Sequence, residues 1–230
     1  MTGAPAHPIA VDPAIAARVR LLAVEADSIQ AGPAPASLRA AIRSACGERA
    51  RLYGGSAPAE IAGVSAARTL YRSFGIDPTH TRPSSEALLR RVIHEKPFPE
   101  ISAPVDLCNL CALLWLLPIG LYDRETLQGD IALRRGEPGE GYEGIRKVRV
   151  DVGGRPVLSD RSGAFGNPTS DSLRTAVTAG TRSLLMVVFA PADMAREALA
   201  ARGEEASALI REHLQPPEAA TPIVTALYGG

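Results

Sequence analysis

The stretch PVDLCNLCALLW, residues 104–115, is the most apolar run of the sequence, and we expect the fold to form around it. Pro104 suits the first turn of a helix, where the missing N–H of proline is not needed, and Pro118 marks the end of the run. Apolar residues on every side predict either a short buried helix or a buried strand that leads into one, because periodicity alone does not separate the two.

Two polar residues, Asp106 and Asn109, interrupt this apolar run. Their spacing of three residues places them on one face if the run is helical. A carboxylate and an amide in such surroundings need partners, because burying them unpaired is unfavourable by a few kcal/mol. They are therefore either a structural pair that holds a neighbouring loop or a polar ligand site on a rigid apolar wall.

The composition describes a protein with a core of small aliphatic side chains and no overall charge. Hydrophobic residues make up 46% and aromatic residues 4% of the 230 residues. This length predicts a single domain over residues 1–230, with loose or extended tails at 1–14 and 216–230. A formal net charge of zero argues against electrostatic binding of long nucleic acid, so we expect no DNA partner. Brief contact of a local patch with a folded RNA stays open.

The cysteine content indicates a reduced, cytoplasmic protein. Cys46, Cys108 and Cys111 are an odd number and form no disulfide framework. The last two have the spacing C-x-x-C, but a structural zinc site needs four ligands and no second pair exists, so we expect neither metal nor cofactor. The start of the chain lacks a signal-peptide pattern, and no run reaches the ~20 apolar residues of a membrane span.

The segment GEGYEG, residues 139–144, matches the pattern GxGxxG, but a dinucleotide site is excluded. That pattern needs a strand before it and a helix after it, whereas here the strand-like residues 148–152 follow. Two glutamates in the loop would also repel a phosphate. The segment predicts a hairpin turn instead.

Helical patterns dominate the first half of the chain, and strand patterns the second. We expect helices over residues 37–51, 58–74, a segment from Ser84 as N-cap, and 191–214. We expect strands over residues 19–24, 119–122, 131–134, 148–152, 157–159, 176–179 and 184–189. Strict βαβ alternation is missing, so the order predicts an α+β fold with a mixed β-sheet framework and surrounding helices.

Two further segments carry polar groups that a ligand site needs. The glycine-rich residues 160–168 follow a strand and predict an irregular loop, which is either a surface turn or a loop that brings backbone N–H groups and Asp160 or Asp171 to a ligand. Arg82, Arg90 and Arg91 form a positive cluster, either a solvated face or a contact for a carboxylate or phosphate.

Together these pieces resemble the B3/B4 domain of the bacterial phenylalanyl-tRNA synthetase beta subunit, and especially the free-standing B3/4 proteins. The resemblance covers about residues 60–190 and is carried by four stretches: YRSFGIDP (71–78) through RPSSEALLRR (82–91), PVDLCN (104–109), LYD (121–123) with Gly129, Ile131, Arg134, Gly139 and Glu140, and LSD (158–160) through Asp171. The ordered set, rather than any one motif, is specific.

The resemblance implies a B3/B4-like fold and an editing activity. In the synthetase this domain removes wrongly attached tyrosine from the phenylalanine tRNA, and a free-standing protein would act in trans on mischarged tRNA. The partners implied are a transiently bound tRNA and an aminoacyl group as small-molecule ligand. Because an aminoacyl ester is already activated, positioning a water and stabilising an oxyanion can suffice, which agrees with the absence of a catalytic-triad motif.

The chain departs from the family's pattern at three places. Cys108 stands where the family's VDxTN segment has threonine, so a thiol replaces a hydroxyl. The histidine of the synthetase's H-A-F-D segment falls at Gly120, so a histidine-dependent role is absent. The acidic residue that reads the tyrosine hydroxyl has Asp171 as its candidate counterpart.

These considerations give a candidate site. The candidate catalytic residues are Asn109, Asp106 and Cys108. The candidate substrate-binding residues are Arg82, Ser84, Glu86, Arg90, Asp160, Gly163, Asn167 and Asp171. In this hypothesis Asn109 and backbone groups of residues 163–167 hold the substrate carbonyl or a water, and Asp106 orients that wall of the site. Arg82 or Arg90 contacts the tRNA 3′ end. Glu86 or Asp171 binds the ammonium group of the amino acid. The alternatives are a non-catalytic binding module for an amino acid or RNA 3′ end, and a structural partner of a synthetase.

Overall fold

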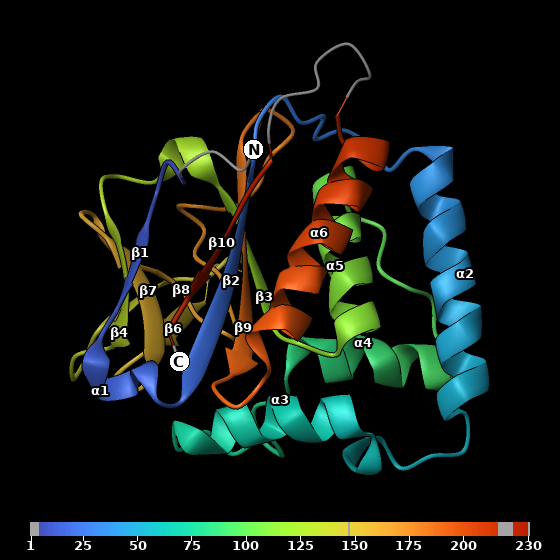
Figure 1. The fold of residues 1–230 in the computed structure, drawn as a ribbon, viewed down its shortest axis with the longest axis horizontal. Helices are drawn as coiled ribbons and strands as arrows, with labels where there is room; N and C mark the ends of the chain where they lie inside the picture. The colour runs from blue at the N-terminus through green and yellow to red at the C-terminus, as the bar shows by residue number, and fades with distance from the viewer. Residues whose placement is uncertain (1–4, 147, 216–222, 230) are drawn as a thin grey trace.

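Strand β2 (Val19–Ala26) lies at the centre of the molecule, in a four-stranded sheet ordered β10-β2-β9-β3. In the computed structural model, which describes residues 5–146, 148–215 and 223–229, this sheet lies between a layer of helices and a second sheet (Figure 1). Leu22 and Val24 pack with the helices, whereas Leu21 and Ala23 pack with the second sheet. Successive side chains of a strand point to opposite faces, so a strand covered on both faces is mostly apolar; Arg20 and Glu25 are the charged residues of β2.

The central sheet is antiparallel throughout. Its other strands are β3 (Ile119–Asp123), β9 (Leu184–Pro191) and β10 (Val224–Tyr228). Strand β10, within the stretch 216–230 that was expected to be a loose or extended tail, pairs with β2 along its whole length. Residues 216–222 and 230 lie outside the described residues.

The second sheet is mixed, as expected, because one of its strand pairs is parallel. Its strands, in order, are β1 (Ile9–Val11), β4 (Ile131–Arg135), β7 (Pro156–Asp160) and β8 (Gly163–Gly166). The pair β1–β4 is parallel and the others are antiparallel. Within the stretch 1–14 that was expected to be a loose or extended tail, β1 joins this sheet and helix α1 (Pro13–Ala16) follows, with Asp12 accepting the N–H of Ala14.

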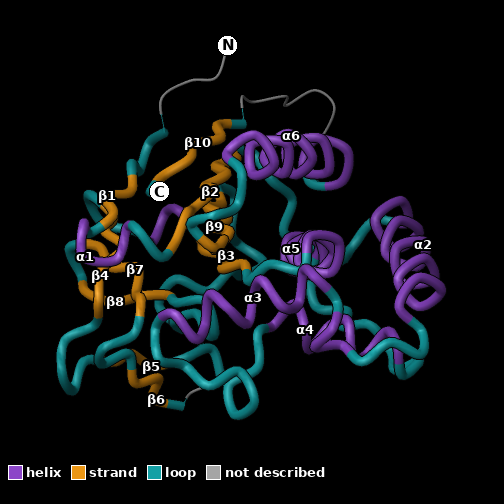
Figure 2. The backbone as a smooth tube through the Cα atoms, turned by 60° about the horizontal axis from the view of Figure 1, so that its bottom comes forward, coloured by secondary structure: helices purple, strands orange, loops and turns teal. Residues whose placement is uncertain are grey.

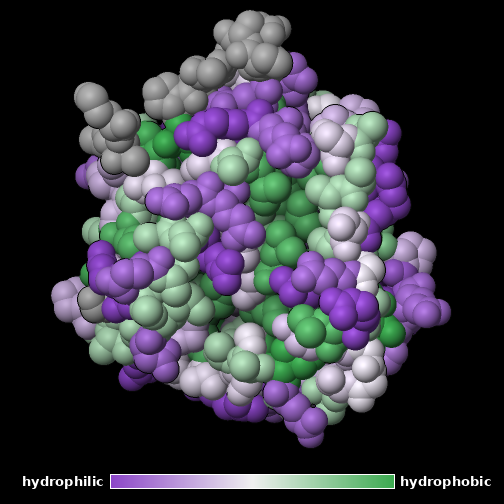
Figure 3. Space-filling view, turned by 45° about the vertical axis from the view of Figure 1, so that its right-hand side comes forward, coloured by the Kyte–Doolittle hydropathy of each residue, from purple (hydrophilic) through white to green (hydrophobic). Residues whose placement is uncertain are grey.

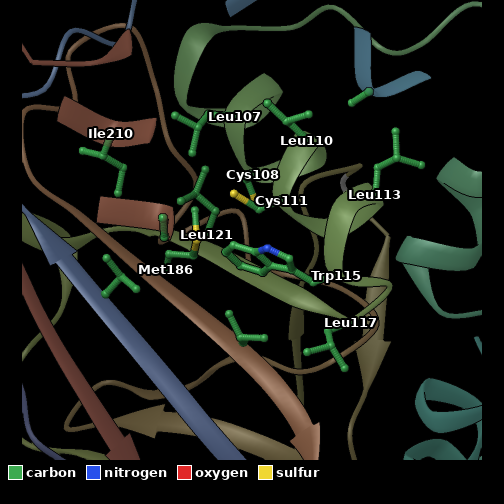
Figure 4. Close-up of a cluster of buried hydrophobic side chains, with 14 of the residues drawn as sticks. Leu107, Cys108, Leu110, Cys111, Leu113, Trp115, Leu117, Leu121, Met186 and Ile210 are labelled. Atoms are coloured by element: carbon green, nitrogen blue, oxygen red, sulfur yellow. The ribbon is translucent and has the colours of Figure 1, made fainter. Parts of the chain in front are cut away.

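Helix α5 (Ala103–Trp115) is the apolar run, and it is buried because other helices cover the sides that the sheet leaves free. It packs against α2 (Ala36–Tyr53), α4 (Ser84–Ile93) and α6 (Arg196–His213). Figure 4 shows Leu107, Leu110 and Cys111 in the same cluster as Met186 of β9 and Ile210 of α6. Leu116, with φ of 57°, ends the helix in a left-handed conformation two residues before Pro118.

Two shorter pieces complete the fold. Helix α3 (Ala62–Ser73) follows the short 3-10 helix η1 (Pro58–Glu60), so the single helix expected over 58–74 is divided. Residues 139–144, expected to be a hairpin turn, instead contain a strand of a hairpin: β5 (Gly141–Glu143) pairs with β6 (Arg149–Asp151) (Figure 2). A second 3-10 helix, η2 (Arg124–Thr126), follows β3.

The sequence patterns misplaced three local features. Residues 176–179 were expected to form a strand, but they lie in irregular structure between β8 and β9. Pro191 ends β9 rather than opening the last helix, because the pairing of β9 with β2 continues to this residue. Pro83 is the N-cap of α4, which makes Ser84 the first residue of that helix. The α+β class is confirmed, and no described helix has the length and apolarity to cross a membrane.

Candidate functional site

A cavity of about 600 Å³ lies where two helices, a hairpin and a loop meet. Helices α4 and α5 supply Ser84 and Asn109, and strand β3 supplies Ile119. The segments around β5 and β6 and the loop after β8 complete the lining with Gly144, Ile145, Arg146, Val148, Val150, Asn167, Pro168, Thr169, Ser170 and Asp171. Of the predicted site residues, the structure therefore brings together Ser84, Asn109, Asn167 and Asp171.

Asn109 and Ser84 are polar groups that the protein itself does not use. Asn109 is half-buried on α5, whose neighbours on either side, Cys108 and Leu110, are fully packed in the core. Within the described part of the chain, neither the Asn109 amide nor the Ser84 hydroxyl makes a hydrogen bond. A rigid helix thus presents an amide and a hydroxyl to the cavity, where both are free to bind a ligand.

The loop over residues 167–171 is fixed from several directions. The Oδ1 atom of Asn167, itself 4% exposed, accepts the N–H groups of Thr169 at 2.7 Å and Ser170 at 2.9 Å. The hydroxyl of Tyr71 on α3 donates to the carbonyl of Pro168 at 2.7 Å, and that of Tyr142 on β5 donates to the carbonyl of Ser170. This wall of the cavity is therefore held in place by α3 and β5 and by its own side chain.

Asp171 closes the loop and has an incompletely bonded carboxylate. Its Oδ2 atom accepts the N–H of Leu121 at 3.3 Å. Its Oδ1 atom is buried and has no hydrogen bond of good geometry, although the hydroxyl of Tyr122 lies beside it. Burial raises the pKa of Asp171 to about 7, because it outweighs the opposite effects of the Tyr122 hydroxyl and the Leu121 N–H.

Cys108 is a packed side chain rather than a reactive one. It is 8% exposed and belongs to the apolar cluster of Figure 4. Burial, with the nearby carboxylate of Asp171 adding to it, raises the pKa of the thiol far above its usual range. The thiol is therefore neutral at neutral pH and is no nucleophile. Among the described residues, no three His, Cys, Asp or Glu side chains come together as metal ligands.

Asp106 lies in a different place from Asn109, so the expectation that they form one polar wall is wrong. Asp106 lines a second cavity of about 490 Å³ beside α2, and its Oδ1 atom accepts the N–H of Ile101 at 2.8 Å. This cavity is on the helical side of the molecule, where Figure 3 shows apolar surface in a hollow between polar side chains. Helix α4 contributes to both cavities from opposite ends, with Ser84 lining the one that holds Asn109 and Val92 lining the one that holds Asp106.

Glu86 is the centre of an arginine cluster and does not line the cavity. It is fully buried, and its two oxygens accept hydrogen bonds from Nε and Nη2 of Arg68, both at 2.7 Å, and from Nε of Arg90 at 2.8 Å. Nε of Arg82 lies 3.6 Å from the same carboxylate. Burial raises the pKa of Glu86, but the hydrogen bonds from Arg68 and Arg90 outweigh this and lower it. The carboxylate is thus committed to arginines, which leaves it no place in ammonium binding.

Asp160 and Gly163 lie on the second sheet, away from the cavity. Asp160 accepts the N–H groups of Gln128 at 2.8 Å and Ser162 at 2.9 Å and pairs with Arg174. Gly163, with φ of 107°, begins strand β8 directly after a tight turn. The segment expected to be a glycine loop is therefore a β7–β8 hairpin, because glycine allows the sharp reversal at this φ. Residues 160–166 do not line the cavity, whereas residues 167 and 168, after the hairpin, do.

Residues 66–216 match the B3/4 domain family, which is about two thirds of the chain. The chain belongs to the B3/4 domain family. Among solved structures, it is similar to an N-terminal fragment of the phenylalanyl-tRNA synthetase beta-subunit from Pyrococcus horikoshii, with 15% identity and a TM-score of 0.45. That similarity covers 94% of this chain and 54% of the fragment, so the chain spans about half of the fragment's length. No curated protein matches the chain.

The residues of this B3/4 domain that sequence reasoning missed are the tyrosines around the cavity wall. Tyr71, Tyr122 and Tyr142 are three of the five tyrosines of the chain, and all three are buried. Tyr122 contacts Phe165 edge-on, with ring centroids 4.9 Å apart and an interplanar angle of 86°. The one sequence signal for these tyrosines is that aromatic residues are few and several lie near predicted strands. Their role beside the cavity could not be predicted, because α3, β3 and β5 come together only in the fold.

Proposed function

We propose that this B3/4 domain hydrolyses the ester of a mischarged aminoacyl-tRNA in trans. One observation carries the proposal: Asn109, Ser84 and Asp171 line one cavity, and the first two have no partner among the described residues. An aminoacyl ester needs only a positioned water and a stabilised oxyanion. The cavity volume of about 600 Å³ suits an aminoacyl group together with part of the terminal nucleoside.

The side chains divide into two roles in this proposal. The amide of Asn109 donates to the ester carbonyl oxygen, on which negative charge develops as water attacks. The hydroxyl of Ser84, at the first turn of α4, binds a polar group of the substrate beside it. Both residues are held by helices that pack on the core, so little ordering is needed when the substrate binds.

The RNA contact is proposed for the basic groups on both sides of the cavity. Arg68, Arg82 and Arg90 share the single carboxylate of Glu86, so the cluster keeps an excess of two positive charges. Arg82 comes two residues before the cavity residue Ser84. Arg146, on the hairpin, lines the cavity from another side and is exposed. Because the net charge of the chain is zero, the contact with the 3′ end of tRNA is local and brief.

The proposal is tested by deacylation of a panel of charged and mischarged tRNAs. We expect rapid release of one amino acid by the unchanged protein and a loss of about 100-fold in Asn109→Ala, as for removal of one oxyanion donor. Gln30→Ala removes an exposed amide outside the cavity and is the matched control, with no expected change. No release of any amino acid by folded protein would contradict the proposal.

A second function is favoured by the two departures from the family's pattern. Cys108 carries a neutral, packed thiol, and no side chain stands at Gly120. A cavity without these polar groups could bind an amino acid or an RNA 3′ end without turnover. Such a binding module would show a rise in melting temperature with ligand and no hydrolysis, because a ligand that binds only the native state stabilises it.

A further inference from the structure

We infer that Asp171 is the general base of the cavity, the group that accepts a proton from the attacking water. This inference rests on the proposed function and adds to it the residue that activates the water. The sequence patterns associated Asp171 only with recognition of the substrate's ammonium or hydroxyl group.

The first argument is the chemistry of the cavity wall. Among the described residues that line it, Asp171 is the one carboxylate, and no histidine or cysteine accompanies it. The other polar side chains are amides, hydroxyls and the guanidinium of Arg146, which do not accept a proton at neutral pH. Cys108, behind the wall, keeps its proton because burial raises the pKa of its thiol. A base in this cavity is therefore Asp171.

The second argument is the set of groups that face the carboxylate. They are Tyr122 from β3, Tyr142 from β5, Tyr71 from α3 and Cys108 from α5. Burial raises the pKa of each, so none of them carries a charge at neutral pH. Among the residues that the structure describes, no cation lowers the pKa of this carboxylate, and burial raises it to about 7. A base with this pKa is half ionised and still a good proton acceptor at neutral pH.

The third argument is the free bonding capacity of the carboxylate. Its single hydrogen bond of acceptable geometry is the one from Leu121 N–H to Oδ2, at 3.3 Å, which is long for a carboxylate. The aspartates with structural roles differ: Asp160 accepts two backbone N–H groups and an arginine. Asp171 is partly exposed as a residue and lines the same cavity as Asn109.

The proton follows a closed path through the reaction. As the water oxygen forms its bond to the ester carbon, one water proton moves to Asp171 and the carbonyl oxygen becomes an oxyanion beside Asn109. The oxyanion then re-forms the carbonyl, the bond to the ribose oxygen breaks, and that oxygen takes the proton from Asp171. The products are the free amino acid and the tRNA with its hydroxyl, and Asp171 is ionised again.

The test is the pH dependence of kcat/KM from pH 5 to 9 on the mischarged tRNA that the panel identifies. For the unchanged protein we expect a tenfold rise per pH unit that levels off near pH 7. Asp171→Asn should lower kcat/KM by at least 100-fold and abolish its rise between pH 5 and 7. Tyr122→Phe removes a hydroxyl that lowers the pKa of Asp171. In this variant kcat/KM should therefore level off at a higher pH.

Each contrary outcome has a distinct meaning. If Asp171→Asn retains activity within threefold of the unchanged protein, another group activates water, and the hydrolytic function stands without this base. If the unchanged protein hydrolyses no substrate, both proposals fall. If the melting curve of Asp171→Asn shows that it does not fold, the pH dependence of the unchanged protein decides. A kcat/KM that does not change from pH 5 to 9 overturns the inference. So does a Tyr122→Phe variant in which kcat/KM levels off at the same pH as in the unchanged protein.

Discussion

The hydroxyl oxygen of Tyr122 lies directly over Gly120, two residues earlier on strand β3. A methyl group on the α-carbon of Gly120 would come within 2.0 Å of this oxygen, and one on Gly166 of β8 within 2.2 Å. The phenol therefore occupies the space that a side chain at either position would need. No larger side chain therefore fits at residue 120 while Tyr122 keeps its position.

Gly120→Ala should destabilise the protein by about 1–3 kcal/mol, and more if Tyr122 cannot move. Its new methyl group meets the buried ring of Tyr122, and overpacking of a core has effects of this size. The measurement is urea unfolding of the variant and the unchanged protein. Gly47→Ala, in the middle of α2 with open space around the new methyl group, is the control and should stabilise by about 0.5–1 kcal/mol. Equal stability of Gly120→Ala and the unchanged protein would show that Tyr122 is free to move.

Asn167→Ala should destabilise the protein and Asn109→Ala should not, although both residues line the same cavity. Asn167→Ala leaves the N–H groups of Thr169 and Ser170 without their acceptor and should lower the unfolding free energy by about 1–3 kcal/mol. Asn109→Ala breaks no hydrogen bond within the described residues, so its melting temperature should stay within about one degree of the unchanged protein. Thermal unfolding of the two variants side by side checks this, and a large loss in Asn109→Ala would mean that its amide is structural.

Asp171 should make the protein less stable as the pH rises toward neutral. Its folded-state pKa of about 7 lies above the ordinary value of 3.8. Its contribution to the free energy of unfolding is therefore fully present below about pH 4 and is lost as the pH rises through 7. Asp171→Asn lacks this ionisation and should gain stability over the unchanged protein across that range, by of the order of 4 kcal/mol at most. Urea unfolding at pH 4, 6 and 8 measures the difference. A difference independent of pH would show that Asp171 titrates normally.

Glu86→Gln should be strongly destabilising at neutral pH, by about 3–5 kcal/mol, because it leaves the guanidinium of Arg68, 12% exposed, without a charge partner. The folded-state pKa of Glu86 is lowered, so its contribution is present above the ordinary value of 4.5 and is lost as the pH falls through the folded-state value. The difference between variant and unchanged protein should therefore shrink in acid. Arg82→Gln, at a side chain 45% exposed, is the control and should change stability by less than about 1 kcal/mol. A loss in Glu86→Gln no larger than that of the control would contradict this account of the cluster.

The apolar run 104–115 and the strand patterns were sufficient to predict the fold class. A run without a polar face is buried in whatever fold it joins, and such a run is found as helix α5. Pattern reading failed where burial depends on a distant partner. Strand β10 is a strand because it pairs with β2, about 200 residues away, and residues 224–228 alone carry no comparable signal.

In the candidate site, too, some features follow from local sequence and others depend on distant partners. By itself, the sequence determined that Asn109 sits in an apolar buried segment and that the residues before Asp171 form an irregular loop, because both follow from local composition. Only the tertiary structure decided that Asn109 and Asp171 line one cavity while Asp106 lines another. The physical reason is that each cavity is built from elements distant in sequence: opposite ends of α4 line the two cavities, and three tyrosines from separate elements surround one carboxylate. Neither arrangement is encoded in the spacing of any one segment.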